Sequence, residues 1–328
     1  MLAAYAATVS AEDPLSGLVV GERPAPQERE GWTVLPVVAA GLNHHDLWSL
    51  RGVGLPEDRL PMTLGCDAVA RHPELGEVVV LPVVAGTPGW RDDITLDPRR
   101  SLLSELHQGT LAQQVVVPDG HWVPRPGHLS AVEAAALSTS WLTAYRMLFR
   151  NADVRPGDTV LVQGAGGGVA TALIQLGVAA GLTVWVTSRD ETKRSRAEGL
   201  GAERSFEPGA RLPARVDAVL ESVGAATWSH SVNALRPGGT IVICGATSGD
   251  APARAELTKI FFRQLRVVGS TMGTLAELRQ LCRFVSSTGL RPEIDSTYPL
   301  ERTRDALHRM QSGELVGKIG ITVEAGAG

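Results

Sequence analysis

The sequence predicts a mixed α/β protein of two domains, one rich in short strands and one built on a parallel sheet covered by helices on both faces. Three observations carry this prediction. The first 125 residues contain short apolar segments separated by Gly and Pro, and the middle of the chain alternates strand-like with helical segments. A glycine-rich turn follows the first strand-like segment of that middle part. Alternating strands and helices favour a parallel sheet, whereas successive short strands favour a barrel-like domain.

Length and composition limit the class of protein. The chain has 328 residues, 44% hydrophobic and 20% charged, which is enough for two folded domains. Its net charge of −4 argues against nucleic acid as a partner, and no apolar run reaches the roughly 18–20 residues of a membrane helix. Three distant cysteines form no disulfide framework, and the acidic start is unlike a signal peptide. We therefore expect a cytoplasmic protein that binds a small-molecule substrate, and neither nucleic acid nor a membrane.

The first elements in chain order are strands, expected at 33–42, 76–84 and 111–118. The polar segment 85–110 carries Gly and Pro, which predicts a surface lobe. A helix is expected over 131–150, because its composition is helical and Ser130 with Glu133 forms a capping box before it.

The middle of the chain begins with one complete strand–helix–strand unit, residues 159–188. Its two strands are mainly apolar, as expected of strands buried on both faces of a parallel sheet. The elements expected after it are a helix at 191–200, a strand at 216–223, a helix at 227–235, strands at 240–246 and 265–271, a helix at 275–289 and a final strand at 317–324.

The glycine-rich turn of this unit indicates a dinucleotide site. Between the first strand and the helix the chain reads Gly164-Ala165-Gly166-Gly167-Gly168-Val169-Ala170. Glycines let the backbone approach a pyrophosphate, whose charge meets free N–H groups at the helix N-terminus. The last position is Ala170, which the fingerprint allows because it needs only close packing of helix and strand. The alternative is a tight turn without a ligand.

The end of the second strand favours NADPH over NADH. An NAD enzyme usually places Asp or Glu there for the ribose hydroxyl, but the chain has Ser188 and Arg189, with Lys193 soon after. A 2′-phosphate prefers such donors, and Arg matches its geometry. Asp190 opposes this interpretation, NADH remains possible, and the alternative is a solvated basic start of a helix.

Several motifs together resemble a known family. Thr143-Ala144-Tyr145 precedes the glycine-rich turn, and Gly269–Gly273 and Gly317-Lys318 follow it. In this arrangement the chain resembles the medium-chain dehydrogenase/reductases over nearly its full length. The segments 43–48, 223–228 and 261–264 resemble the quinone-oxidoreductase-like branch, often labelled zinc-binding dehydrogenase.

The resemblance implies an architecture and a set of cofactor residues. A Rossmann domain, residues 126–271, would be inserted into a β-rich GroES-like catalytic domain made of 1–125 and 272–328, with the site in the cleft and a homodimer or tetramer as the assembly. The residues expected to line the cofactor are Thr143, Gly164, Gly166, Gly167, Gly168, Val169, Ser188, Arg189, Lys193, Gly245, Ala246, Thr247, Thr271, Met272 and Lys318.

The resemblance also implies the absence of zinc. Zinc prefers sulfur and nitrogen ligands in tetrahedral geometry. The three positions that bind catalytic zinc in zinc alcohol dehydrogenases are Asn43, Cys66 and Thr139 here, and only one of them is a suitable ligand. Residues 85–110 contain none of the four cysteines of the structural zinc lobe.

Without zinc, the easiest chemistry is hydride transfer from NADPH to an activated acceptor, namely a quinone or an α,β-unsaturated carbonyl compound. The candidate catalytic residues are Asn43 and Thr143, His45 as a proton donor and Trp48 as a wall of the pocket. Asn43 would hold a nicotinamide or substrate oxygen, or else close a turn, and His45 and Trp48 have structural alternatives. We expect Asp46 to be a structural acceptor, and solvent is another proton source. The alternative functions are a carbonyl reductase or alcohol dehydrogenase, and an NADPH-binding sensor without activity.

Overall fold

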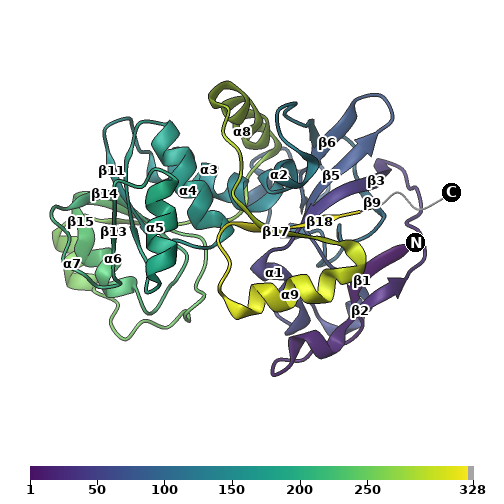
Figure 1. Ribbon diagram of the computed structural model, residues 1–328, viewed down its shortest axis with the longest axis horizontal. Coiled ribbons are helices and arrows are strands. Elements are labelled where there is room, and N and C mark those ends of the chain that lie inside the picture. The colour runs from purple at the N-terminus through teal and green to yellow at the C-terminus, as the bar shows by residue number, and fades with distance from the viewer. Residues whose placement is uncertain (324–328) are drawn as a thin grey trace. The chain divides into compact units, whose positions relative to one another are not determined.

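The computed structural model describes residues 1–323, which form two compact units (Figure 1). Unit 1 comprises Met1–Leu142 and the chain from Met272 onward, and unit 2 comprises Thr143–Thr271. Glu324, the last residue of the predicted final strand, lies outside the described residues, as does the rest of the predicted domain to Gly328. Within residues 1–323, no helix combines the length and the apolar character needed to cross a membrane.

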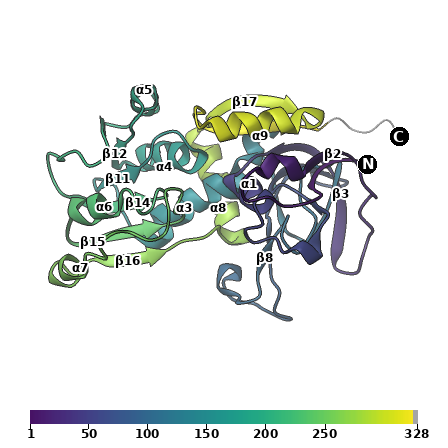
Figure 2. The same cartoon turned by 90° about the horizontal axis from the view of Figure 1, so that it is seen from below.

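Unit 2 is built on six parallel strands in the order β13-β12-β11-β14-β15-β16 (Figures 1 and 2). The strands are β11 (Thr159–Gln163), β12 (Thr183–Thr187), β13 (Arg204–Phe206), β14 (Val216–Glu221), β15 (Leu235–Ile243) and β16 (Arg266–Gly269). Because the chain runs outward from β11 on one side and returns to β14 on the other, the strand order reverses between β11 and β14. Ligands of open α/β sheets bind at the carboxyl ends of the strands at such a point.

Helices cover this sheet, which confirms the predicted doubly wound α/β fold. Helices α4 and α5 contact β11, β12 and β13, whereas α6 and the π-helical segment η5 contact β14 and β15. The helical elements of this part of the chain are α3 (Leu142–Arg146), η5 (Met147–Ala152), α4 (Gly168–Ala179), α5 (Glu191–Gly199), α6 (Trp228–Ala234) and α7 (Leu257–Phe262).

Unit 1 is the β-rich part. A largely antiparallel sheet runs β10-β6-β5-β3-β18-β17, with β9 also paired to β3, beside a three-stranded sheet β2-β1-β4 and a two-stranded sheet β7-β8. The strands are β1 (Leu2–Ala6), β2 (Leu18–Glu22), β3 (Trp32–Gly41), β4 (Met62–Thr63), β5 (Asp67–His72), β6 (Gly76–Val80), β7 (Val83–Val84), β8 (Ser101–Leu102), β9 (Gln114–Pro118), β10 (Trp122–Pro124), β17 (Ile294–Pro299) and β18 (Lys318–Thr322).

Short helices join and cover these strands. The helical elements are η1 (Pro14–Gly17), α1 (His44–Leu50), η2 (Glu57–Arg59), η3 (Ile94–Leu96), α2 (Ala131–Ala135), η4 (Leu137–Trp141), α8 (Leu275–Thr288), η6 (Leu300–Arg302) and α9 (Thr303–Ser312). The long strand β3 is central, and its buried residues Leu35, Val37 and Ala40 belong to the hydrophobic core of this unit.

The predicted helix 131–150 is divided in the structure. Its capping box is present, since Ser130 Oγ accepts from Glu133 N and Ser130 N donates to Glu133 Oε2. Helix α2 gives way to the π-helical segment η4, and α3 gives way to η5.

The first boundary between the units falls at Leu142, later than the predicted position at residue 125. The reason is the packing of α2 on the sheet of unit 1. A Cβ atom on Gly320 of β18 would lie 2.2 Å from Val132 Cγ1, so α2 rests directly on that strand. The residues from 126 to 142 therefore belong to unit 1.

Candidate active site

The glycine-rich turn leads from β11 into α4 at the point where the strand order reverses. Gly164 has φ +89°, a left-handed conformation that favours glycine. Gly167 is the N-cap of α4 and no side chain caps the helix, so the first N–H groups have no side-chain acceptor. A Cβ atom on Gly167 would meet no atom within 4 Å. The turn therefore leaves open space beside uncapped N–H groups, as a pyrophosphate requires.

Close packing of α4 on the sheet involves a later glycine than the fingerprint position. A Cβ atom on Gly177 would lie 2.9 Å from Val184 Cγ2 of β12. Ala170 itself is buried. The packing requirement that we assigned to Ala170 is thus shared with Gly177.

A buried polar network holds the carboxyl ends of three strands beneath the turn. Gln163 at the end of β11 accepts from Thr187 Oγ1 at the end of β12 (2.6 Å) and donates to Ser231 Oγ (3.0 Å). Glu221 at the end of β14 accepts from Ser231 Oγ (2.6 Å) and from the backbone N–H of Val223 (2.7 Å). The sequence analysis missed Gln163 and Glu221. Their signal is a polar residue closing an otherwise apolar strand.

The region after β12 presents a free guanidinium. Asp190 accepts from Lys193 N (3.2 Å) and so caps α5, while its own N–H donates to Ser188 Oγ (3.2 Å). Arg194 donates to Ser188 O (2.7 Å). Arg189 is exposed and has no partner within residues 1–323. The carboxylate that weakened the NADPH prediction thus serves as a helix cap.

The other predicted cofactor residues in unit 2 also follow strands of this sheet. Gly245, Ala246 and Thr247 follow β15, and Thr271 follows β16. Thr143 is the first residue of the unit and is buried. Because the strands are parallel, the segments after them lie at one edge of the sheet. Met272 and Lys318 belong to unit 1.

The two cysteines outside the zinc-ligand positions are protonated at neutral pH. Burial, and after it the Glu221 carboxylate, raises the pKa of Cys244 to about 12. Burial raises the pKa of Cys282 to about 12 as well. Cys282 is buried, which fits the interpretation of cysteine as a small buried residue, whereas Cys244 is half-buried.

In unit 1, Asn43 stands at the junction of β3 and α1. Its N–H donates to Asp46 Oδ2 (2.8 Å), and Asp46 Oδ1 accepts from Gly65 N (2.9 Å). Asp46 is fully buried, and burial raises its pKa despite these donors. Asp46 is therefore a structural acceptor that fixes the start of α1, and Trp48 lies half-buried on the same helix.

The side-chain amide of Asn43 has one engaged end and one free end. Oδ1 accepts from the Lys318 ammonium at 2.8 Å, and Nδ2 is buried with no hydrogen-bond partner among residues 1–323. The hydroxyl of Thr139, at the third zinc-ligand position, is also buried and unpaired. A buried donor without a partner costs about 1–3 kcal/mol, so these groups are suited to a ligand.

His45 belongs to a cluster with residues of the polar lobe. Its Nε2 lies 3.1 Å from Glu105 Oε1, and its Nδ1 lies 3.4 Å from Ser104 Oγ and 3.7 Å from Cys66 Sγ. Cys66 Sγ donates to Leu103 O (3.2 Å). Burial alone would lower the pKa of His45, but the contacts with Cys66 and Glu105 outweigh burial and raise it. The sequence analysis missed Ser104 and Glu105, which lie in a segment without periodicity.

The lobe 85–110 is held by a carboxylate. Asp97 is fully buried and accepts from the backbone N–H groups of Gly86, Thr87 and Arg99 at 2.8–2.9 Å, and from the Thr87 hydroxyl at 2.5 Å. Burial alone would raise the pKa of Asp97, but these bonds outweigh it and hold the pKa well below its usual range. The lobe thus has a central anchor without the four cysteines of a zinc site.

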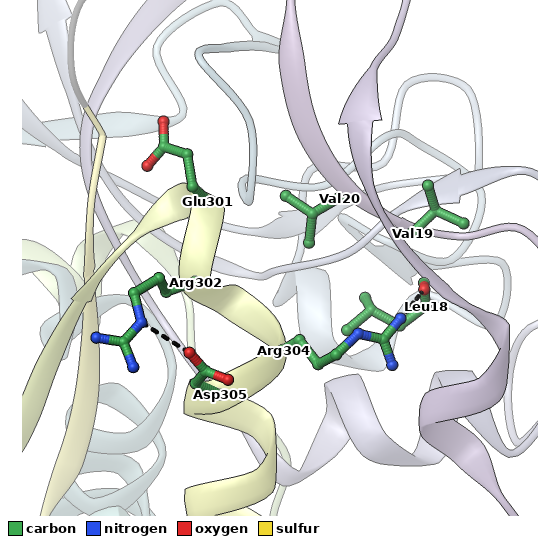
Figure 3. A pocket seen from close by; sticks show the side chains of 7 residues that line it. All are labelled: Leu18, Val19, Val20, Glu301, Arg302, Arg304 and Asp305. Carbon is green, nitrogen blue, oxygen red and sulfur yellow. Dashed lines mark hydrogen bonds and ion pairs between the residues drawn. The ribbon is translucent and has the colours of Figure 1, made fainter.

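A separate hollow of about 460 Å³ lies between β2 and α9 (Figure 3). Its arginines are engaged, since Arg304 donates to the carbonyls of Leu15 and Leu18 and Arg302 donates to Asp305 (2.7 Å). It shares no residue with the site around Asn43. We interpret this hollow as part of the contact between the N-terminal strands and α9, and not as a ligand site.

The fold and the glycine-rich turn define a protein of two units with a Rossmann-type dinucleotide site. Residues 168–287 match the zinc-binding dehydrogenase family. A solved NAD-dependent alcohol dehydrogenase is 31% identical, with a TM-score of 0.89 over 99% of this chain and all of that chain. A cobalt- and zinc-bound alcohol dehydrogenase from Pyrobaculum aerophilum is 28% identical, with a TM-score of 0.86 over 98% of both chains.

Curated proteins give the same result. The zinc-type alcohol dehydrogenase-like protein YogA of Leptosphaeria maculans is 29% identical, over 93% of this chain and 94% of that protein. Crotonyl-CoA reductase of Streptomyces collinus is 26% identical, over 94% of this chain and 82% of that protein. The chain belongs to the medium-chain dehydrogenase/reductase superfamily and is an oxidoreductase with Rossmann-type dinucleotide binding.

Proposed function

We propose that this protein is an NADPH-dependent, zinc-independent oxidoreductase that transfers hydride to a quinone or to an α,β-unsaturated carbonyl compound. The observation that carries this proposal is the buried, unpaired Nδ2 of Asn43 at a position that holds a zinc ligand in zinc alcohol dehydrogenases. Crotonyl-CoA reductase, a relative named for an α,β-unsaturated substrate, supports the choice of acceptor.

The donor set around Asn43 does not suit zinc. The Asn43 Oδ1 atom already faces the Lys318 ammonium, and a second cation beside it would be repelled. Of the three positions that bind catalytic zinc in zinc alcohol dehydrogenases, only Cys66 carries a side chain that zinc prefers. Among residues 1–323, no group of three or more His, Cys, Asp or Glu is placed to hold a metal.

Asn43 has a definite role in this proposal. When bound, NADPH supplies the hydride, which adds to the β-carbon while the electron pair of the double bond moves toward the carbonyl oxygen. Asn43 Nδ2 would donate to that oxygen as its negative charge develops. One such donor contributes roughly 10²- to 10³-fold to the rate of comparable reactions.

His45 has a positioning role in the proposal. Both ring nitrogens already face partners in unit 1, so neither is free to meet a substrate. We therefore assign His45 to holding Ser104 and Glu105 in place, and solvent to completing the product with a proton. Trp48 and Thr143 remain predicted substrate contacts.

Turnover measurements with several acceptors test the proposed function. Steady-state NADPH oxidation should proceed with an enone or a quinone and not with a saturated aldehyde. Metal analysis of the same preparation, purified without chelator, should find far less than one zinc per chain. Aldehyde reduction with about one zinc per chain would establish the alcohol dehydrogenase alternative. Tight NADPH binding without turnover on a broad panel would indicate a sensor.

We predict that Arg189→Ala weakens NADPH binding and leaves NADH binding nearly unchanged. Arg189 is exposed and has no partner in the described part of the chain, as expected of a group that meets a 2′-phosphate. A charge-assisted hydrogen bond contributes roughly 1.5–3 kcal/mol, which corresponds to about a 10- to 150-fold loss. Exposure and salt place the effect at the low end. Dissociation constants of both cofactors at one ionic strength provide the measurement, and equal losses for both would contradict the assignment.

We also propose that the protein is a homodimer joined through β16. This strand is the edge of the sheet in unit 2, and Leu257, Phe261, Phe262 and Val267 on α7 and β16 are 68%, 65%, 76% and 44% exposed. An open edge with apolar neighbours favours pairing with another strand. Antiparallel pairing of two copies about a twofold axis presents the same edge to both partners.

The dimer proposal predicts a change in mass on substitution. The native protein should elute with twice the chain mass of 34.7 kDa, and Phe261→Asp combined with Phe262→Asp should give a monomer. Charges introduced into a desolvated contact are costly, whereas the same charges on a free surface are not. Leu75→Asp, at another exposed leucine, serves as the control. A native monomer, or a dimer that survives both substitutions, would refute this interface.

A further inference from the structure

A buried ion pair stands behind the amide of Asn43. Lys318 opens β18 and Asp67 opens β5, the two strands that flank the end of β3. Lys318 Nζ lies 2.7 Å from Asp67 Oδ2, with the two side chains 5% and 0% exposed. Gly41 of β3 makes room for this contact, since a Cβ atom there would lie 2.8 Å from Asp67 Oδ2. The ammonium thus reaches the carboxylate past a strand that carries no side chain at that position.

The ammonium of Lys318 is fully engaged within unit 1. Its Nζ donates hydrogen bonds to Asn43 Oδ1 at 2.8 Å and to the carbonyl of Leu42, and it forms the ion pair with Asp67 Oδ2. All three contacts lie within unit 1, whereas the family resemblance predicts that Lys318 lines the cofactor. Neither oxygen of Asp67 has a hydrogen-bond partner within residues 1–323, so the ammonium of Lys318 is what compensates its buried charge.

This contact determines the orientation of the Asn43 amide. An ammonium only donates, so the atom that faces it must be the amide oxygen. The other end, Nδ2, is consequently the end without a partner. Reversing the amide would place two donors against each other and leave the oxygen unpaired, so the amide has one favourable orientation. A cation on the oxygen also draws electron density from the amide, which strengthens Nδ2 as a donor.

We propose that Lys318 and Asp67 are positioning residues that orient and polarise the Asn43 amide for the oxygen of the acceptor. Lys318 acts on the amide, and Asp67 compensates the buried charge of Lys318 and holds its nitrogen in place. The catalytic consequence rests on the proposed function, in which Asn43 donates to the acceptor, while the structural link between the three side chains does not.

The test removes both charges together in Lys318→Met combined with Asp67→Asn. The single change Lys318→Met would leave an unpaired buried carboxylate and so endanger folding. We expect kcat for an enone to fall about 10- to 100-fold with KM for NADPH unchanged, because the donor is weakened but not removed. In an Asn43→Ala background, which introduces no buried carboxylate, the same pair should cause little further loss, since the amide is already gone. The matched control is Arg309→Met with Asp295→Asn, which removes another ion pair of unit 1 (3.0 Å).

A second readout does not depend on activity. The chain has three asparagines, Asn43, Asn151 and Asn233, so labelling the side-chain nitrogen of asparagine gives three ¹⁵N signals, each with a pair of hydrogens. The signal lost in Asn43→Asp is that of Asn43, and it should shift in the Lys318/Asp67 variant and stay in place in the Arg309/Asp295 control.

The outcomes separate the two proposals. The positioning role would be overturned if the Asn43 signal did not shift in the Lys318/Asp67 variant. It would also be overturned if this variant kept the turnover of the native protein. A loss of NADPH affinity with kcat intact would also overturn it and make Lys318 a cofactor ligand. A shifted signal in a protein that reduces no acceptor would support the positioning role and refute the proposed function.

Discussion

Replacing Gly167 by Val is expected to weaken NADPH binding by at least about 100-fold while the protein remains folded. Gly167 has φ −75° and ψ 161°, which Val adopts readily, and a Cβ atom there meets nothing within 4 Å. The new side chain would fill the space beside the first N–H groups of α4. Losing two charge-assisted hydrogen bonds to a pyrophosphate, each contributing roughly 1.5–3 kcal/mol, accounts for this loss.

The controls for Gly167→Val distinguish a loss of cofactor binding at the glycine-rich turn from a loss of folding. Gly199 ends α5, and a Cβ atom there also meets nothing, so Gly199→Val should leave affinity and the thermal unfolding midpoint nearly unchanged. NADH and NADPH share the pyrophosphate, so Gly167→Val should weaken both alike, unlike Arg189→Ala. Titration by fluorescence or calorimetry measures these affinities. Native affinity in a folded Gly167→Val protein would mean that the turn binds no pyrophosphate.

The parallel-sheet unit was predictable because each of its signals is local. The strands β11 and β12 have apolar interiors, and glycine follows β11 directly, so the strand–helix–strand unit was placed within a residue or two. The segments after parallel strands lie at one edge of a sheet, which explains why most of the cofactor candidates fall in unit 2.

The first boundary between the units was less predictable because it depends on a distant contact. Residues 131–150 have uniformly helical composition, with no break at Leu142. The packing of Val132 against Gly320 assigns the start of this segment to unit 1. The sequence near residue 132 gives no sign of this distant contact. The short strands β1, β2 and β17 were not predicted for a related reason, since their pairing partners rather than their own pattern define them.

The sequence predicted several residues of the candidate site but not the contacts between them. The motif that contains Asn43 and His45 was found from the sequence, but Glu105 is 60 residues from His45 and Lys318 is 275 residues from Asn43. No periodicity links such positions. The structure was needed to show that Nδ2 of Asn43 has no partner among the described residues, because this depends on Lys318 binding the Oδ1 end of the amide.

Replacing Asn43 by Asp should lower kcat for an enone about 10²- to 10³-fold with little change in NADPH affinity. The substitution is nearly isosteric, and Asp is a favourable N-cap for α1. The Lys318 ammonium would pair with the new carboxylate and keep it ionised, so the fold should persist. The donor Nδ2 would be replaced by an oxygen without a hydrogen, and its negative charge would oppose the charge that develops on the acceptor.

The measurement for Asn43→Asp is kcat and KM for one enone at saturating NADPH, with cofactor affinity measured separately. Asn233→Asp introduces the same charge at an exposed asparagine in unit 2 and should leave kcat unchanged. An interaction made only in the transition state lowers kcat and kcat/KM equally, whereas one made equally with the bound substrate raises KM alone. Retention of native kcat would show that Asn43 only closes the turn between β3 and α1. The electrophilic group would then have to be sought elsewhere, first at the unpaired hydroxyl of Thr139.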